Sequence, residues 1–390
     1  MSCEKSSQPS DTSFFRYFDL MRFVAAGLVM FSHARDLLLV DYAQANSHSA
    51  AIKLLYAITG LGHEAVVIFF VLSGFWIASS IDRRKEAPYP WRNYAIDRLA
   101  RLYIVLLPAL ALTCLCDSLG IYLQHSALYE GHMGPHSVTT RIADQLDIGT
   151  LLGNLAFLQT LFVKTYGSNG PLWSLANEFW YYLAYPGLFL LVWRRQPSVW
   201  LLACPLVLYF PALRSGMVVW LAGAGLYYIT RGRPVSPPRS GLLSGGLIGL
   251  AVLALIGSLA LSRSAKLDYG MADLAIGGSF TLLLWLLMQF RPRFARPLAP
   301  LADFGAQASF SLYLCHFPLI ALLSTMLTGA GRLQPDGRGL ALLIGLGIVA
   351  TLYSLLFAWC TERHTTTLRR WLKQRFIPAL HAPVDRAPAM

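Results

Sequence analysis

Of the 390 residues in the chain, 55% are apolar and only 13% are charged, and the mean hydropathy is +0.50. Because soluble domains carry about 25% charged residues, this composition excludes an ordinary soluble protein. In a soluble protein, a net charge of +12 would suggest binding to nucleic acid. Here we attribute it to cytoplasmic loops that fix orientation and face anionic lipids, so we expect membrane lipids as partners and no nucleic acid.

We predict ten membrane-crossing stretches, each of which needs roughly 20 mostly apolar residues in a helix. Two of them, 198–213 and 215–230, are short, and we expect them to tilt or to cross where the bilayer is thinned. The alternating segments of about ten residues that are typical of a membrane β-barrel do not occur in the sequence. We therefore predict an all-α polytopic membrane protein with cytoplasmic N- and C-termini. The predicted spans are 17–39, 55–79, 99–120, 171–193, 198–213, 215–230, 241–262, 271–290, 306–328 and 339–361.

Segment 149–163 is too short to be counted as a clear crossing, and we predict an interfacial or re-entrant helix there. With this layout 22 of the 32 Lys and Arg residues lie in cytoplasmic segments, as the positive-inside rule requires. Residues 1–13 would form a cytoplasmic N-terminal segment and 14–362 a membrane domain. Residues 363–390 would form a basic cytoplasmic tail with a disordered end.

The first predicted span contains three polar residues, Asp19, Arg22 and His33. Arg22 and His33 are eleven residues apart, about three helical turns, so they share one face roughly 16 Å apart. An arginine near the cytoplasmic end can hold phosphate groups, and a deeper histidine can move a proton. A charge anchor combined with a packing histidine is the alternative interpretation.

The second and third predicted spans add a serine and two arginines. Ser73 lies in the run Phe69-Phe70-Val71-Leu72-Ser73-Gly74-Phe75, which by itself is also typical of close helix packing. Arg98 and Arg101 are one turn apart at the cytoplasmic mouth of the third span. They either orient this helix or bind a pyrophosphate or 3′-phosphate.

The fourth and ninth predicted spans each contain one ionisable residue at depth. Glu178 lies two turns below the outer surface with no basic residue within one turn, so it must pair across helices, bond a ligand or stay protonated. His316, near mid-membrane, is expected to bond a neighbouring carbonyl. Three further histidines occur in loop 121–148, but their spacing favours a solvated loop, and we predict no metal site. They are His125, His132 and His136.

The order of these elements resembles the acyltransferase-3 family of membrane O-acyltransferases over roughly residues 14–362. The most specific element is an arginine that is separated by ten residues from a histidine, and Arg22 and His33 match it. The FFVLSGF run, the basic pair, a Trp-Ser-Leu-x-x-Glu-Phe pattern and a Tyr-Leu-x-His pattern follow in the family's order. These four elements correspond to residues 69–75, to Arg98 and Arg101, to Trp173, Ser174 and Glu178, and to Tyr313 and His316.

The resemblance implies transfer of an acyl group, commonly acetyl, from cytoplasmic acyl-CoA to a hydroxyl of a polysaccharide, lipopolysaccharide, exopolysaccharide or lipid-linked glycan. It also implies a bacterial inner membrane and acetyl-CoA, or another acyl-CoA, as co-substrate. In this interpretation His33 is the general base and Glu178 orients it or binds the sugar. The donor would be bound by Arg22, Arg98, Arg101 and Ser73.

Two questions remain open at the level of the sequence. Transfer can be direct, or it can pass through an acyl group on His33 or Ser73. A transporter or flippase for a glycan precursor would also place ionisable residues inside the membrane, although no repeat relates the two halves of the chain. The sequence does not specify an oligomeric state.

Overall fold

The computed structural model describes residues 12–87, 90–123, 127–132, 138–232, 241–264, 267–292, 294–329 and 331–377. Over these residues the fold is all-α, and the only β-type pairs are two isolated bridges, Leu39 with Leu333 and Gln159 with Val163. The predicted N-terminal segment, apart from Thr12 and Ser13, and the predicted disordered end of the tail lie outside the described residues.

Thirteen α-helices and five short 3-10 helices (η) make up the described chain. The α-helices are α1 Thr12–Leu38, α2 Ala50–Thr59, α3 Gly62–Arg84, α4 Pro90–Leu123, α5 Ile148–Leu155, α6 Leu172–Arg194, α7 Ala203–Tyr209, α8 Pro211–Thr230, α9 Leu242–Ser262, α10 Tyr269–Phe290, α11 Ala299–Thr328, α12 Gly337–Cys360 and α13 Thr365–Phe376. The 3-10 helices are η1 Tyr42–Gln44, η2 Ile142–Gln145, η3 Val199–Leu202, η4 Arg296–Leu298 and η5 Glu362–His364.

Seven helical stretches of the described chain are long and apolar enough to cross a membrane. They are Gly62–Arg84, Pro90–Leu123, Pro211–Thr230, Leu242–Ser262, Tyr269–Phe290, Gln307–Thr328 and Gly337–Phe376. Helices α1 and α6 are also long, but polar residues such as Arg22 and Glu178 lower their hydropathy. The total of ten spans and the cytoplasmic termini therefore stay predictions.

Two predicted segments take shorter forms in the structure. The predicted span 198–213 contains η3 and α7, which together cover only Val199–Tyr209 and are too short to cross a bilayer of ordinary thickness. In segment 149–163 the helical part is α5, which ends at Leu155, and turns with positive φ at Phe157 and Thr160 follow it. The Asp147 side chain caps α5 by accepting a hydrogen bond from the Thr150 N–H at 3.0 Å.

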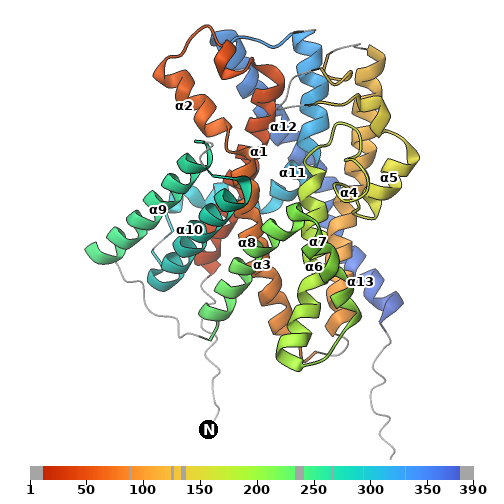
Figure 1. Cartoon of the computed structure of the whole chain (residues 1–390), viewed down its shortest axis with the longest axis vertical. Coiled ribbons are helices and arrows are strands. Elements are labelled where there is room, and N and C mark those ends of the chain that lie inside the picture. Colours follow the sequence, from red (N-terminus) through yellow and green to blue (C-terminus); the bar gives the residue numbers. More distant parts are fainter. Residues whose placement is uncertain are drawn as a thin grey trace, which may run out of the picture.

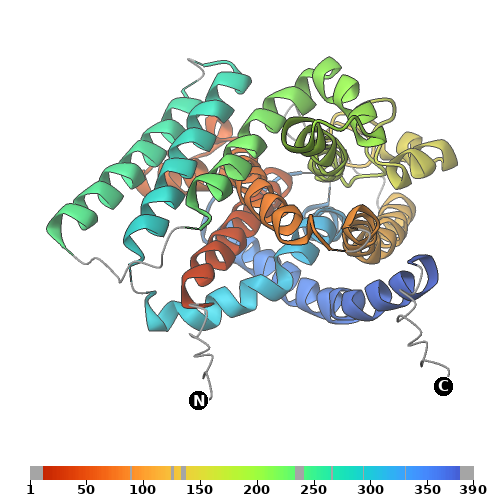
Figure 2. The ribbon, with the colours of Figure 1, turned by 90° about the horizontal axis from the view of Figure 1, so that it is seen from below.

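The helices form one bundle in which α1 packs along α11, α3 along α8 and α9 along α10. Figure 1 shows α4, α11 and α12 reaching its upper end, whereas α3, α6, α8 and α10 occupy its lower half. Figure 2 shows α9 at one edge of the bundle, where most of its apolar side chains are exposed. Such an apolar outer face is what lipid contact requires.

Glycines bring α3 and α8 into backbone contact. A Cβ atom added at Gly74 would overlap the carbonyl oxygen of Trp220, and one added at Gly223 would overlap that of Val71. Small residues of this kind let helices pack closely in membranes, where apolar burial gives little drive for association. The contact fixes the position of the Trp220 side chain relative to α3.

A buried carboxylate anchors α13 to α4 at the lower end of the bundle. The Asp97 side chain, only 2% exposed, forms an ion pair with Arg84, one at 2.8 Å with Lys373 Nζ and one at 3.9 Å with Arg369 Nε. A buried charge is costly unless it is paired, and here three cations surround it. The last described helix is thereby held against the helix that contains Arg98 and Arg101.

Candidate active site

A cavity of about 390 Å³ lies inside the bundle. Five helices contribute its wall, which combines charged, polar, aromatic and aliphatic side chains. The lining residues are Asp19 and Arg22 of α1; Val66, Phe69, Phe70, Leu72, Ser73, Trp76 and Ile77 of α3; Arg98, Arg101 and Leu102 of α4; Ser174, Leu175, Glu178 and Tyr182 of α6; and Ser309, Phe310 and Tyr313 of α11.

The structure brings together most of the residues that the sequence singled out. Five of the six predicted site residues line this cavity, although they come from four helices spread over more than 150 residues of chain. They are Arg22, Ser73, Arg98, Arg101 and Glu178. The sixth, His33, is not among the lining residues.

Three arginines give the cavity a strongly basic part. The Arg101 guanidinium lies over the Phe310 ring at 5.2 Å and 3.8 Å from a carboxylate oxygen of Glu362. Arg98 lies near the Tyr94 ring, and its buried Nε has no hydrogen-bond partner among the described residues. Guanidinium groups with spare donors are suited to phosphate, which they bind in a bidentate manner.

A hydrogen-bonded cluster surrounds Glu178. Its Oε1 atom accepts hydrogen bonds from the Ser73 hydroxyl and from the Tyr182 hydroxyl, each at 2.5 Å. The Ser73 Oγ atom in turn accepts a hydrogen bond from the indole N–H of Trp220 at 3.2 Å and lies 3.3 Å from the Tyr182 hydroxyl. Glu178 therefore pairs across helices, one of the three possibilities that its depth allowed.

Contacts of the neighbouring side chains fix the rotation of α6 that points Glu178 into the cavity. On its other faces the Trp180 indole donates to the Phe157 carbonyl at 2.9 Å, and the Tyr181 hydroxyl donates to the Leu213 carbonyl at 2.8 Å. Because Glu178 and Tyr182 are four residues apart, they lie on the same face. This face is the one turned toward Ser73.

Ser174 and Tyr313, which both belong to patterns shared with the acyltransferase-3 family, meet at a second point of the cavity wall. The hydroxyls of Ser174 and Tyr313 are 2.5 Å apart, and the Tyr313 hydroxyl also lies 3.3 Å from the Pro171 carbonyl oxygen, to which it donates. The Tyr313 ring contacts Phe69 edge-on at 5.7 Å between centroids. Residues 139 positions apart thus close the wall between α6 and α11.

His33 stacks on His316 next to this wall. Their ring centroids are 5.4 Å apart with planes 23° from parallel, and the Phe317 ring packs edge-on against His33 at 5.0 Å. His316 Nδ1 is 2.7 Å from the Leu312 carbonyl oxygen, so it carries the proton, and its buried Nε2 has no partner in the described part of the chain. The hydrogen bonds of Glu178 go to Ser73 and Tyr182, and none of its described bonds reaches His33.

A group that includes His63 and Glu64, a departure from the family pattern whose role the sequence leaves open, lies where α3, α6, α9 and α10 meet. His63 Nε2 is 2.8 Å from Asp273 Oδ1, and its ring is nearly parallel to that of Trp173 at 6.0 Å between centroids. The neighbouring Glu64 accepts a hydrogen bond from Ser262 at 2.9 Å. His63 and Glu64 adjoin the FFVLSGF run in sequence, but their partners come from residues about 200 positions later and no local pattern indicates them.

Of the three loop histidines, His125 and His136 lie outside the described residues, and His132 is exposed. Within the described part of the chain no three His, Cys, Asp or Glu side chains are grouped so that they could hold a metal ion.

Apolar helices around an internal cavity with a carboxylate cluster and three arginines define a polytopic membrane protein with a buried polar site. The chain also matches the model of an acyltransferase domain family, the acyltransferase-3 family, over residues 15–363. The protein belongs to this family and is a membrane acyltransferase. Neither the comparison with curated proteins nor that with solved structures gave a match.

Proposed function

We propose that the protein is an O-acetyltransferase that moves an acetyl group from cytoplasmic acetyl-CoA to a hydroxyl of a surface or lipid-linked glycan in a bacterial inner membrane. The observation that carries this proposal is the cavity, whose wall combines three arginines with the Glu178 cluster. Coenzyme A has several phosphate charges, and arginine is the residue best suited to bind them. The cavity volume of about 390 Å³ lies within the range of small-molecule sites and suits the acyl-pantetheine arm.

Apart from His33, which is not among the lining residues, the division of roles follows the wall of the cavity. Arg22, Arg98 and Arg101 would bind the phosphates of the donor, and the thioester would reach toward Ser73 and Glu178. His33, on the same helix as Arg22, is the proposed general base that takes the proton of the acceptor hydroxyl. A positioned base of this kind contributes about 10²–10⁴-fold to a rate.

The proposal is tested by thiol release from acetyl-CoA, measured with purified protein in lipid nanodiscs and a panel of oligosaccharides. We expect the wild type to release coenzyme A and the His33→Ala variant to lose about 10²–10⁴-fold of the transfer rate. His132→Ala, a change at an exposed loop histidine, is the matched control and should leave the rate unchanged. Absence of thiol release, together with glycan movement across sealed vesicles, would favour transport instead.

A further inference from the structure

Ser73 differs from most hydroxyl residues in the helices of this protein. Thr113, Thr281 and Ser354 donate to the carbonyl four residues earlier, which is the usual arrangement inside a helix. The Ser73 hydroxyl instead donates across helices to the Glu178 carboxylate at 2.5 Å. A hydroxyl held by a carboxylate base is the arrangement that activates a serine nucleophile.

The surroundings of Ser73 suit attack on a carbonyl group. Its Oγ atom borders the cavity that also contains the arginines, so a donor bound there can present its thioester to this oxygen. The indole N–H of Trp220 and the hydroxyl of Tyr182 lie 3.2 and 3.3 Å from Oγ. The Trp220 N–H donates to Ser73 Oγ and the Tyr182 hydroxyl donates to Glu178, so both side chains hold the serine and its carboxylate base in place.

We propose that Ser73 is a catalytic nucleophile and that the acyl group passes through an ester on its Oγ atom. This inference rests on the proposed function and divides it into two half-reactions. In the first, Ser73 Oγ attacks the thioester carbonyl and its proton moves to Glu178. The carbon–sulfur bond breaks, and coenzyme A leaves as a thiolate that takes a proton from cytoplasmic water. The products are acyl-Ser73, protonated Glu178 and free coenzyme A.

The second half-reaction restores the site. The acceptor hydroxyl attacks the ester carbonyl, and its proton goes to His33, the base proposed above. The bond between the acyl carbon and Ser73 Oγ breaks, and Glu178 returns its proton to this oxygen. His33 then releases its proton to water, so one proton leaves the acceptor and one is gained by the thiolate.

This sequence of steps assigns different variants to different half-reactions. Glu178 is required for formation of the ester, whereas His33 is required only for its transfer to the acceptor. We therefore expect His33→Ala to accumulate acyl-Ser73 up to one acyl group per protein with a single burst of thiol release. Glu178→Gln should form the ester about 10²–10⁴-fold more slowly.

The experiment uses purified full-length protein, acetyl-CoA with a radiolabelled acetyl group, acid quenching and peptide mass spectrometry. We expect an ester on Ser73 in the wild type, a larger amount in His33→Ala and none in Ser73→Ala. Ser73→Cys keeps a nucleophile and should carry the label as a thioester, which also shows that the site remains folded. Ser80→Ala is the matched control, because Ser80 is a buried serine of the same helix that does not line the cavity.

The outcomes separate this inference from the proposed function. Thiol release by the wild type without any acyl group on Ser73, or with the label on His33, would overturn the nucleophile and leave the acyltransferase in place. Undiminished thiol release by Ser73→Ala would do the same. No thiol release by the wild type with any acceptor would overturn the proposed function itself.

Discussion

Arg98 and Arg101 line the same cavity but have different surroundings. The Arg101 guanidinium lies 3.8 Å from the Glu362 carboxylate, whose other contacts are the Ser311 backbone N–H at 3.1 Å and hydroxyl at 2.6 Å. Arg98 has no ion pair among the described residues, and its Nε atom is buried without a hydrogen-bond partner. The group with unused donors is therefore Arg98.

We predict that Arg98→Ala weakens binding of coenzyme A by about 10- to 100-fold, because hydrogen bonds to charged groups contribute about 1.5–3 kcal/mol. Arg98→Lys should restore only part of the affinity, since lysine keeps the charge but loses the bidentate geometry. The measurement is the Kd of coenzyme A by isothermal titration calorimetry. Arg195→Ala, a change at an exposed arginine at the end of α6, is the control. Equal affinities for all variants would exclude Arg98 from the donor site.

The residue scale also shows where prediction from the sequence ends. Arg98 and Arg101 both line the cavity, because residues one turn apart share a face of the helix. Helical spacing placed Arg22 and His33 on one face as well, but only Arg22 lines the cavity, since the cavity covers part of the length of α1. The bond between Ser73 and Glu178 joins positions 105 residues apart, and only tertiary packing determines it.

At the scale of elements, the contact between α3 and α8 holds one wall of the site in place. Gly223 lies against the backbone of Val71, and Gly74 lies against that of Trp220. Each glycine therefore sits where any side chain would force the helices apart. The same contact sets the 3.2 Å distance between the Trp220 indole and Ser73.

We predict that Gly223→Ala lowers the free energy of unfolding by about 1–3 kcal/mol, which is the usual cost of overpacking, and that it also reduces acyl transfer. Gly225→Ala on the same helix is the control, because a Cβ atom there has no heavy atom within 4 Å and alanine is the better helix former. Thermal unfolding of both variants in nanodiscs measures the effect. A Gly223→Ala protein as stable as the wild type would contradict the close helix contact.

The elements themselves were predicted best where they are long and apolar. Helices α9 and α10 agree with the predicted spans 241–262 and 271–290 to within two residues. The prediction was poorer for 198–213, where the chain leaves α7 at Phe210 and Pro211 begins α8. Hydropathy shows how apolar a stretch of sequence is, but it does not predict where the helix within it ends.

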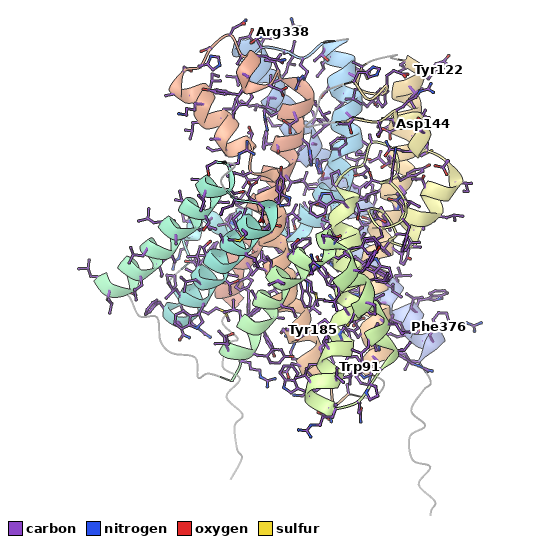
Figure 3. All side chains as sticks on the ribbon, in the orientation of Figure 1. Trp91, Tyr122, Asp144, Tyr185, Arg338 and Phe376 are labelled. Carbon is purple, nitrogen blue, oxygen red and sulfur yellow. The ribbon has the colours of Figure 1, made fainter. Side chains whose placement is uncertain are left out.

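On the scale of the whole molecule, the orientation in the membrane is the prediction with the widest consequences. Figure 3 shows Arg338 and Tyr122 toward the upper end of the bundle and Trp91 and Phe376 toward the lower end. The described start of α1 and helix α13 also lie in the lower part of the bundle (Figure 1). The positive-inside rule assigns this lower side to the cytoplasm.

We predict that a cysteine introduced at Arg338 reacts with a membrane-impermeant maleimide added to intact cells. A cysteine at Arg195 should react only in inverted membrane vesicles. Both changes are made in a background without Cys3, which belongs to the predicted cytoplasmic N-terminal segment, and without Cys360, which is exposed in the structure. Detection of the bound maleimide on a gel shows from which side of the membrane each cysteine is accessible. Labelling of both positions from the same side would refute the orientation and with it the cytoplasmic donor site.

The ion pairs of Asp97 have a consequence for the order in which the protein is assembled. Asp97 and Arg84 leave the ribosome early, whereas Arg369 and Lys373 are synthesised more than 270 residues after Asp97. Until then this carboxylate has only one of its three cationic partners, and a buried charge without full pairing is unfavourable. We therefore expect the helix that contains Arg98 and Arg101 to reach its final position only at the end of translation. A nascent chain that lacks α13 leaves this end of the bundle unfinished, so we expect the cavity lined by Arg98 and Arg101 to be completed only when nearly the whole protein exists.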